Sequence, residues 1–153
     1  MNNMSIAFSL HLLAAALWVG GMFFAYTALR PVAASLLEPP IRLELWQQVF
    51  KRFFIWVWVF VLIISLSGYY LIFFRFMGFS NVGVSVHLMQ LTGWSMFLIY
   101  TYLYFSPYKK FKNYLSEEKL PQAAECLNVI RKGIATNLTL GLITIFIAST
   151  HRF

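Results

Sequence analysis

The sequence predicts an all-α integral membrane protein, a bundle of four transmembrane helices. Of its 153 residues, 60% are hydrophobic, 19% are aromatic and only 11% are charged, a composition that soluble globular domains do not have. A helix crosses the hydrocarbon layer with about 20 mostly apolar residues, and residues 5–29, 53–74, 82–105 and 133–150 meet or approach this length. These runs are continuously apolar and lack the alternation of β-barrel strands. We therefore expect one membrane domain over residues 1–153.

The positions of the basic residues predict how the helices are oriented. Four of the twelve Lys and Arg residues lie in residues 30–52 and six in residues 106–132, whereas only Arg75 and Arg152 lie elsewhere. The positive-inside rule then makes both basic connections cytoplasmic loops and puts both termini on the outer, periplasmic side. The net charge of +7 thus reports topology and does not indicate a nucleic-acid partner. For a bacterial source, the predicted location is the inner membrane, with multiple passes and the lipid bilayer as main partner.

The first helix, residues 5–29, lacks the basic flank of a secretory signal and is expected to be retained. Arg30-Pro31 is expected to end it, and Pro39-Pro40 to prevent a long continuous helix, because proline disrupts a helix interior. Residues 41–54 indicate a short interfacial helix that leads into the second span. The first connection is therefore predicted to be a loop with a short helical insert.

The third helix, residues 82–105, is expected to end at Ser106-Pro107. The lysine-rich stretch that follows carries interspersed aromatic and aliphatic residues, which is typical of a helix lying along a membrane surface. Pro121 suits the first turn of a new helix leading to the fourth span, residues 133–150.

Two histidines lie in similar sequences of the first and third helices, SLHLLAAALW (residues 9–18) and SVHLMQLTGW (residues 85–94). With a rise of about 1.5 Å per residue, His11 and His87 each lie roughly 8–9 Å below the start of their helices, at one depth in the outer half. Trp18 and Trp94 follow seven residues later on the same faces. Because the two helices run in the same direction, we expect these faces to confront each other.

Two neutral imidazoles on facing helices suit the axial positions of haem iron. The sequence therefore predicts haem b held between the first and third helices, with His11 and His87 as metal ligands. Arginines at the outer ends of the second and fourth helices are placed to pair with haem propionates. The predicted cofactor-binding residues are His11, His87, Arg75, Trp18, Trp94 and Arg152. Such a site suits electron transfer or a haem-dependent oxidation near the outer face, with a quinone or a redox protein as partner, and no catalytic residue is assigned.

Other classes of function remain open. A copper-binding protein would assemble its site across helices, for example from His11, His87 and His151, because His87 and Met89 point about 200° apart on one helix. An accessory protein without a cofactor would use the histidines only for hydrogen bonds inside the bundle, and association of several copies of the chain is also open. No carboxylate lies inside a predicted span, which disfavours a proton pump built on buried Asp or Glu.

Three segments carry a resemblance to a known group. HLLAAALWVGGMFF (residues 11–24), HLMQLTGWSMFLIYTYLYFSPYKKF (residues 87–111) and RKGIATNLTLGLITIFIAS (residues 131–149) resemble small membrane proteins of the CopD-like family. This resemblance implies a link to copper import or copper resistance.

A more distant similarity is to HemJ-type protoporphyrinogen IX oxidases, which bind haem b in four membrane helices. Their first helix has a histidine, tryptophan and glycine arrangement that matches His11, Trp18 and Gly20 or Gly21, and it implies a haem-dependent oxidoreductase. Their third helix begins His-Ala-Lys, where this chain has Met89 in place of the lysine. Because a thioether neither binds an anionic substrate nor moves a proton, this difference argues against the oxidase activity but not against haem.

Overall fold

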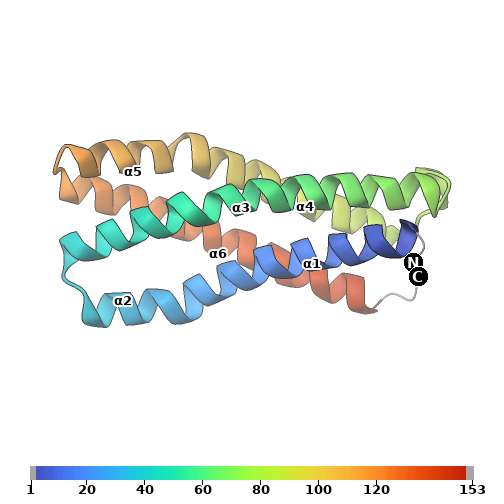
Figure 1. Cartoon of the computed structure of the whole chain (residues 1–153), viewed down its shortest axis with the longest axis horizontal. Coiled ribbons are helices and arrows are strands. Elements are labelled where there is room, and N and C mark those ends of the chain that lie inside the picture. The colour runs from blue at the N-terminus through green and yellow to red at the C-terminus, as the bar shows by residue number, and fades with distance from the viewer. Residues whose placement is uncertain (1–2, 151–153) are drawn as a thin grey trace.

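The computed structural model describes residues 3–150, which are helical nearly throughout (Figure 1). Within this range no strand forms, so the predicted all-α class is confirmed. The elements are α1 Asn3–Phe24, the π-helical turn η1 Ala25–Leu29, α2 Arg30–Leu36, α3 Pro39–Phe74, the 3-10 turn η2 Phe79–Asn81, α4 Val84–Phe105, α5 Pro107–Ser116 and α6 Leu120–Thr150.

The bundle consists of two helical hairpins. α1 packs mainly on α3, and α4 packs mainly on α6, with smaller contacts of α6 on α1 and α3. α1 and α4 run in the same direction, as expected, and the first residues of α1 lie at the same end as the last residues of α6 (Figure 1). We call this the terminal end of the bundle, and the opposite end, where α2 meets α3 and α5 meets α6, the basic end.

The long helices are apolar enough to cross a membrane. Among residues 3–150, the stretches Asn3–Leu36, Pro39–Phe74 and Leu120–Thr150 satisfy both length and hydropathy, whereas the 22-residue α4 does not. α4 has the length to cross, but its polar residues, such as Gln90 and Thr92, lower its hydropathy. Large apolar side chains cover the outer surface of the bundle, among them Leu66, which is 72% exposed. This surface fits a lipid bilayer, and inner-membrane location is consistent with it.

Aromatic rings fill the space between α3, α4 and α5. The ring of Phe54 lies 4.9 Å from that of Tyr108 and 5.5 Å from that of Tyr100, and the Tyr100 hydroxyl donates a 2.7 Å hydrogen bond to the Phe54 carbonyl. On the other side, the buried Asn137 of α6 donates from Nδ2 to the Met96 carbonyl of α4 at 3.0 Å. These polar contacts fix how the helices face one another in a core that is otherwise apolar.

The first helix does not end at Arg30-Pro31, so that prediction is wrong. A π-helical turn precedes the proline, and the backbone N–H of Arg30 bonds to the carbonyl of Ala25, five residues earlier. The wider turn relieves the clash that a proline ring makes with the preceding helical turn, so the helix continues to Leu36. The true break is at Leu37 and Glu38, directly before Pro39-Pro40, which open α3 as expected.

The two basic connections are also more helical than predicted. Residues 41–54 belong to α3, which is one uninterrupted helix of 36 residues. α5 packs on α6, with its apolar side chains Tyr108 and Phe111 buried in the bundle. α6 begins at Leu120 with Pro121 in its first turn, as predicted. Apolar runs locate the membrane-buried part of a helix, and helices continue beyond it wherever another helix covers them.

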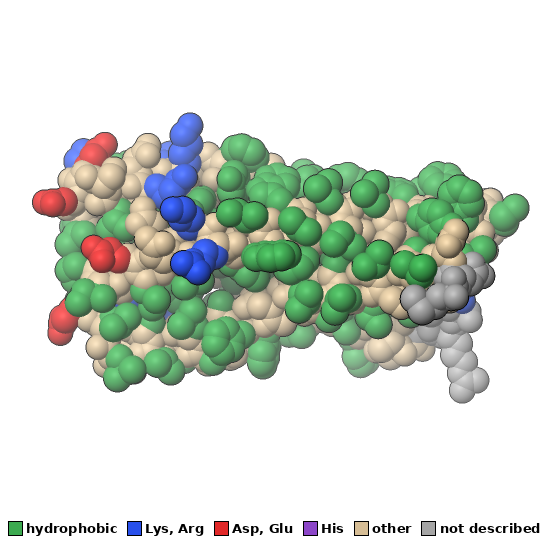
Figure 2. Space-filling model, in the orientation of Figure 1, with side chains coloured by type: hydrophobic (Ala, Val, Ile, Leu, Met, Phe, Trp, Pro, Cys, Tyr) green, Lys and Arg blue, Asp and Glu red, His purple; other side chains and the backbone are tan. Residues whose placement is uncertain are grey.

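Charged side chains gather near the basic end. Figure 2 shows a band of lysine and arginine side chains between the apolar body of the bundle and the acidic side chains at its tip. The positive-inside rule predicts that this end is cytoplasmic, with the terminal end outside.

Candidate functional site

His11 of α1 is half-buried against α3 near the terminal end. Its Nδ1 lies 3.0 Å from the carbonyl oxygen of Ile64 and 3.1 Å from Oγ of Ser67. The histidine thus bridges the two helices of the first hairpin, at a depth where such a polar contact has little competition from water.

The partners of His11 determine which of its nitrogens carries the proton. The Ile64 carbonyl can only accept a hydrogen bond, and the Ser67 hydroxyl already donates its proton to the Ile63 carbonyl. The Ile64 contact therefore requires an N–H at Nδ1. In the neutral form of the ring the lone pair is then on Nε2, which is the arrangement of metal-binding histidines whose second nitrogen donates to a backbone carbonyl.

Gly68 provides the space for the His11 ring. A Cβ at this position would lie 3.1 Å from Cε1 of His11, closer than ordinary van der Waals contact, and 3.4 Å from its Nδ1. The Nδ1–Cε1 edge of the imidazole therefore lies directly on the α3 backbone. Ser67 and Gly68 together form a seat for the ring, which we call the Ser-Gly seat.

His87, by contrast, lies on an exposed face of α4. Within residues 3–150 it makes no side-chain hydrogen bond, ion pair or ring contact. α4 packs on α6 while α1 packs on α3, so the structure brings His11 to α3 and does not bring it to His87.

The two histidines lie at similar depths. A Cβ on Gly141 of α6 would contact both Val19 of α1 and Met96 of α4, which follow His11 by eight residues and His87 by nine, about 12 and 13.5 Å along the helices. The equal depth expected from the sequence is therefore found, and the two histidines differ in which helix their side chains face.

The remaining predicted residues are dispersed. Trp18 is buried and packs edge-on against Tyr100 with 6.4 Å between ring centroids, whereas Trp94 is half-exposed. Arg75 is exposed at the end of α3, over the ring of Phe76, and borders a shallow pocket whose other lining residues are Met4, Ser5, Phe8 and Ser9. Arg152 and His151 lie outside the described residues. The cofactor-binding roles predicted for Trp18, Trp94, Arg75 and Arg152 stay predictions.

No group of three or more His, Cys, Asp or Glu side chains capable of holding a metal ion forms within residues 3–150. Thioethers are distributed separately: Met22 and Met96 are buried in the core, and Met4 lies at the terminal end on the same face of α1 as His11. The metal-ligand roles of His11 and His87 stay predictions.

Sequence reasoning identified His11 but missed the Ser-Gly seat. The dipeptide Ser67-Gly68 stands inside an apolar run of the second predicted helix, where a small residue next to a hydroxyl marks a close approach of another helix. That signal identifies the position in α3 but not which helix approaches it.

Comparisons with known proteins give one positive result. No curated protein and no solved structure matches the chain. The CopD family, described as Copper resistance protein D, matches residues 47–151, which is about two thirds of the chain. The match covers most of α3 and all of α4 and α5, together with α6, and begins after the helix that carries His11. The chain belongs to the CopD family of membrane proteins.

Proposed function

We propose that the protein binds copper ions and passes them across the membrane, and that His11 is the residue that contacts the ion. The observation that carries this proposal is the hydrogen bond from Nδ1 of His11 to the Ile64 carbonyl, which leaves Nε2 with a lone pair. Imidazole nitrogen is a good ligand for copper. We choose copper as the metal because the family is described as Copper resistance protein D.

A second soft ligand supports passage rather than permanent storage. Met4 lies seven residues before His11 on the same face of α1, about 10 Å nearer the terminal end, and it borders the shallow pocket beside Arg75. This spacing is too long for both side chains to hold one ion. An ion handed from Met4 to His11 would be held weakly at each step, as transport requires.

Haem b between α1 and α4 is the second candidate, because an axial histidine needs the same hydrogen bond from its other nitrogen. It requires His87 as the second ligand, and only His11 is oriented by a partner within the described chain. A haem protein would also imply electron transfer to a quinone or a redox protein. We therefore place copper first.

The test is Cu(I) binding by the purified full-length protein, measured in detergent by competition with a chromophoric chelator under reducing conditions. The decisive variant is His11→Asn, whose amide keeps a donor near the position of Nδ1 but provides no nitrogen at Nε2. We expect its Cu(I) affinity to fall by roughly tenfold or more, since replacing even the partners of a metal ligand costs 10–100-fold. His87→Asn is the matched control and should leave the affinity unchanged.

Two further measurements separate the alternatives. Copper uptake into proteoliposomes should fall in His11→Asn and not in His87→Asn. A Soret band in the purified protein that disappears in both variants would instead establish the haem assignment. Copper affinity that is equal in all three proteins would contradict the role of His11.

A further inference from the structure

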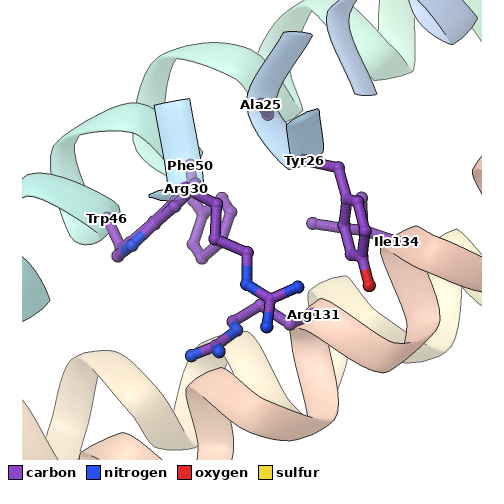
Figure 3. A pocket seen from close by; sticks show the side chains of 7 residues that line it. All are labelled: Ala25, Tyr26, Arg30, Trp46, Phe50, Arg131 and Ile134. Carbon is purple, nitrogen blue, oxygen red and sulfur yellow. The ribbon is translucent and has the colours of Figure 1, made fainter. Parts of the chain in front are cut away.

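A second site lies at the basic end, far from His11. A small hollow opens there between η1, the first turns of α3 and the middle of α6 (Figure 3). Its wall is mostly apolar, with two guanidinium groups at its side. The lining residues are Ala25, Tyr26, Arg30, Trp46, Phe50, Arg131 and Ile134.

Two arginines from distant parts of the chain approach each other at this hollow. Figure 3 shows the side chain of Arg30, from the start of α2, reaching across the hollow to the side chain of Arg131, which extends along α6. Burial lowers the pKa of Arg131, and the charges of Arg30 and Arg42 lower it further. All three side chains are half-buried, so water screens the repulsion between their charges less than at an open surface.

No carboxylate neutralises this cluster within the described chain. The single ion pair among residues 3–150 joins Lys119 to Glu117 at 2.7 Å, where Glu117 raises the pKa of Lys119. The acidic side chains instead lie at the tip of the bundle (Figure 2). Arg30 is held over the ring of Tyr26, with 5.0 Å from its Cζ to the ring centroid, and Arg42 reaches only the Ala34 carbonyl at 3.5 Å. Most of the guanidinium N–H groups are therefore available to an anion.

The backbone beside the hollow is unusual as well. The hollow takes Ala25 and Tyr26 from η1, the π-helical turn, and Arg30 ends that turn. π-helical turns are rare and are frequently found at functional sites. Here the turn gives Tyr26 and Arg30 positions that a regular α-helix would not give them.

The location of the cluster identifies the kind of anion. Figure 2 shows a basic band between the apolar body and the acidic tip, which is the level at which lipid phosphates lie beside a membrane protein, and Arg30 and Arg131 are basic residues of this end of the bundle. Trp46 and Tyr26 are side chains typical of that level. The hollow is too small to enclose a metabolite, but a phosphate at its mouth reaches the guanidinium groups while an acyl chain covers the apolar side of the bundle.

From this arrangement we infer that Arg30, Arg131 and Arg42 form a binding site for the phosphate group of an anionic phospholipid. The lipid neutralises a repulsive cluster and joins α2, α3 and α6 at the basic end. Guanidinium groups bind phosphate through paired N–H donors, which lysine cannot provide in the same geometry. The inference does not depend on copper binding.

The test compares lipid retention by the full-length protein and its variants. Protein is reconstituted into nanodiscs of phosphatidylcholine with a minor fraction of phosphatidylglycerol, extracted into detergent, and examined by native mass spectrometry. We expect the wild type to retain phosphatidylglycerol in preference to phosphatidylcholine. Arg30→Gln and Arg131→Gln should each lower this retention by well over the roughly fivefold that any one basic residue near the surface contributes, because each also removes paired N–H donors. Arg52→Gln, an exposed arginine of the basic end, is the matched control and should lower retention by about fivefold at most.

A stability measurement separates lipid binding from a purely structural role. In phosphatidylcholine alone, Arg131→Gln should raise the unfolding temperature, because it removes like-charge repulsion. With phosphatidylglycerol present, the wild type should become the more stable of the two. A variant that is less stable in both lipids, or an Arg52→Gln protein that loses lipid equally, would overturn the inference. A further outcome is that inorganic phosphate displaces phosphatidylglycerol and stabilises the wild type as strongly as the lipid does. That result would show that the site binds free phosphate and would overturn the assignment to a phospholipid.

Discussion

The stretches around His11 and His87 are alike in sequence and unlike in structure. In the first, His11 is seated on α3 by two contacts of its Nδ1, and Trp18 is only 5% exposed. In the second, His87 is exposed and Trp94 is 47% exposed. The histidine and tryptophan are thus more buried in the stretch on α1 than in the stretch on α4, whereas the serines are the reverse, since Ser9 is exposed and Ser85 is 4% exposed.

The difference arises from the neighbouring helix and not from the stretches themselves. α1 turns His11 onto the Ser-Gly seat of α3, where an imidazole fits, whereas α4 turns Ser85 inward and leaves His87 exposed. Equal spacing along two helices therefore does not make two side chains equivalent. His11, whose Nδ1 proton is held by the Ile64 carbonyl, is the better candidate for a metal ligand than His87.

The largest expected contrast is between the two tryptophans. Trp18→Ala removes a buried ring that packs against Tyr100, and we expect it to lower the free energy of unfolding by about 3–5 kcal/mol. Trp94→Ala removes a half-exposed ring and one hydrogen bond to Tyr69, with an expected loss of about 1 kcal/mol. Reversible unfolding in mixed micelles with increasing denaturing detergent measures both. Similar losses would show that the two stretches are more alike than their exposure indicates.

A pair of glycine substitutions tests the Ser-Gly seat. Gly68→Val places a side chain against the His11 ring, and overpacking of this kind costs about 1–3 kcal/mol. It should also weaken Cu(I) binding, because the ring is displaced from the Ile64 carbonyl. Gly93→Val in the second stretch is the matched control, since a Cβ there meets nothing within 4 Å, and it should change the free energy of unfolding by about 0.5 kcal/mol at most. Unchanged Cu(I) affinity in a folded Gly68→Val protein would argue against the seat as a support for metal binding.

The smallest expected effect concerns the serine of the seat. Ser67→Ala removes one of the two oxygens near Nδ1 of His11 but leaves the Ile64 carbonyl, so we expect a loss of about 0.6 kcal/mol. Ser65→Ala is a suitable control, because the Ser65 side chain makes no hydrogen bond within residues 3–150 and its removal should leave the free energy of unfolding unchanged. A much larger loss in Ser67→Ala would mean that the hydroxyl, and not the carbonyl, holds the imidazole.

Much of the fold follows from the sequence, for a physical reason. Runs of apolar residues long enough to cross a membrane must be helices, so four helices and two hairpins were predictable. The ends of the helices were less predictable from the sequence. An apolar run stops where charged residues begin, but the hydrogen-bonded helix continues past that point. Pro31 is the clearest case, since its disruptive effect is absorbed by a π-helical turn that no local pattern indicates.

The candidate site was predictable in part. His11 was identifiable as an ionisable residue inside a membrane helix. Its partner was not, because the helical period gives the face of each residue but not which helix that face meets. The pairing with His87 assumed that α1 and α4 lie against each other, whereas the hairpin connections place α1 on α3 and α4 on α6. The arginine cluster was missed for a related reason, since Arg30 and Arg131 are about a hundred residues apart in the sequence. The positive-inside rule already accounted for their positive charges, so nothing in the sequence indicated that the two side chains meet.

The length of α3 has a mechanical consequence. This single helix carries the carbonyl of Ile64 that holds His11 and also the side chains of Trp46 and Phe50 that line the hollow at the basic end. Phe50 and Ile64 are fourteen residues apart, a distance of about 21 Å along the axis. An unbroken helix tilts as a rod, so a change in its inclination moves both ends at once. A tilt of α3 would therefore move the support of His11 and the wall of the hollow beside the arginines together.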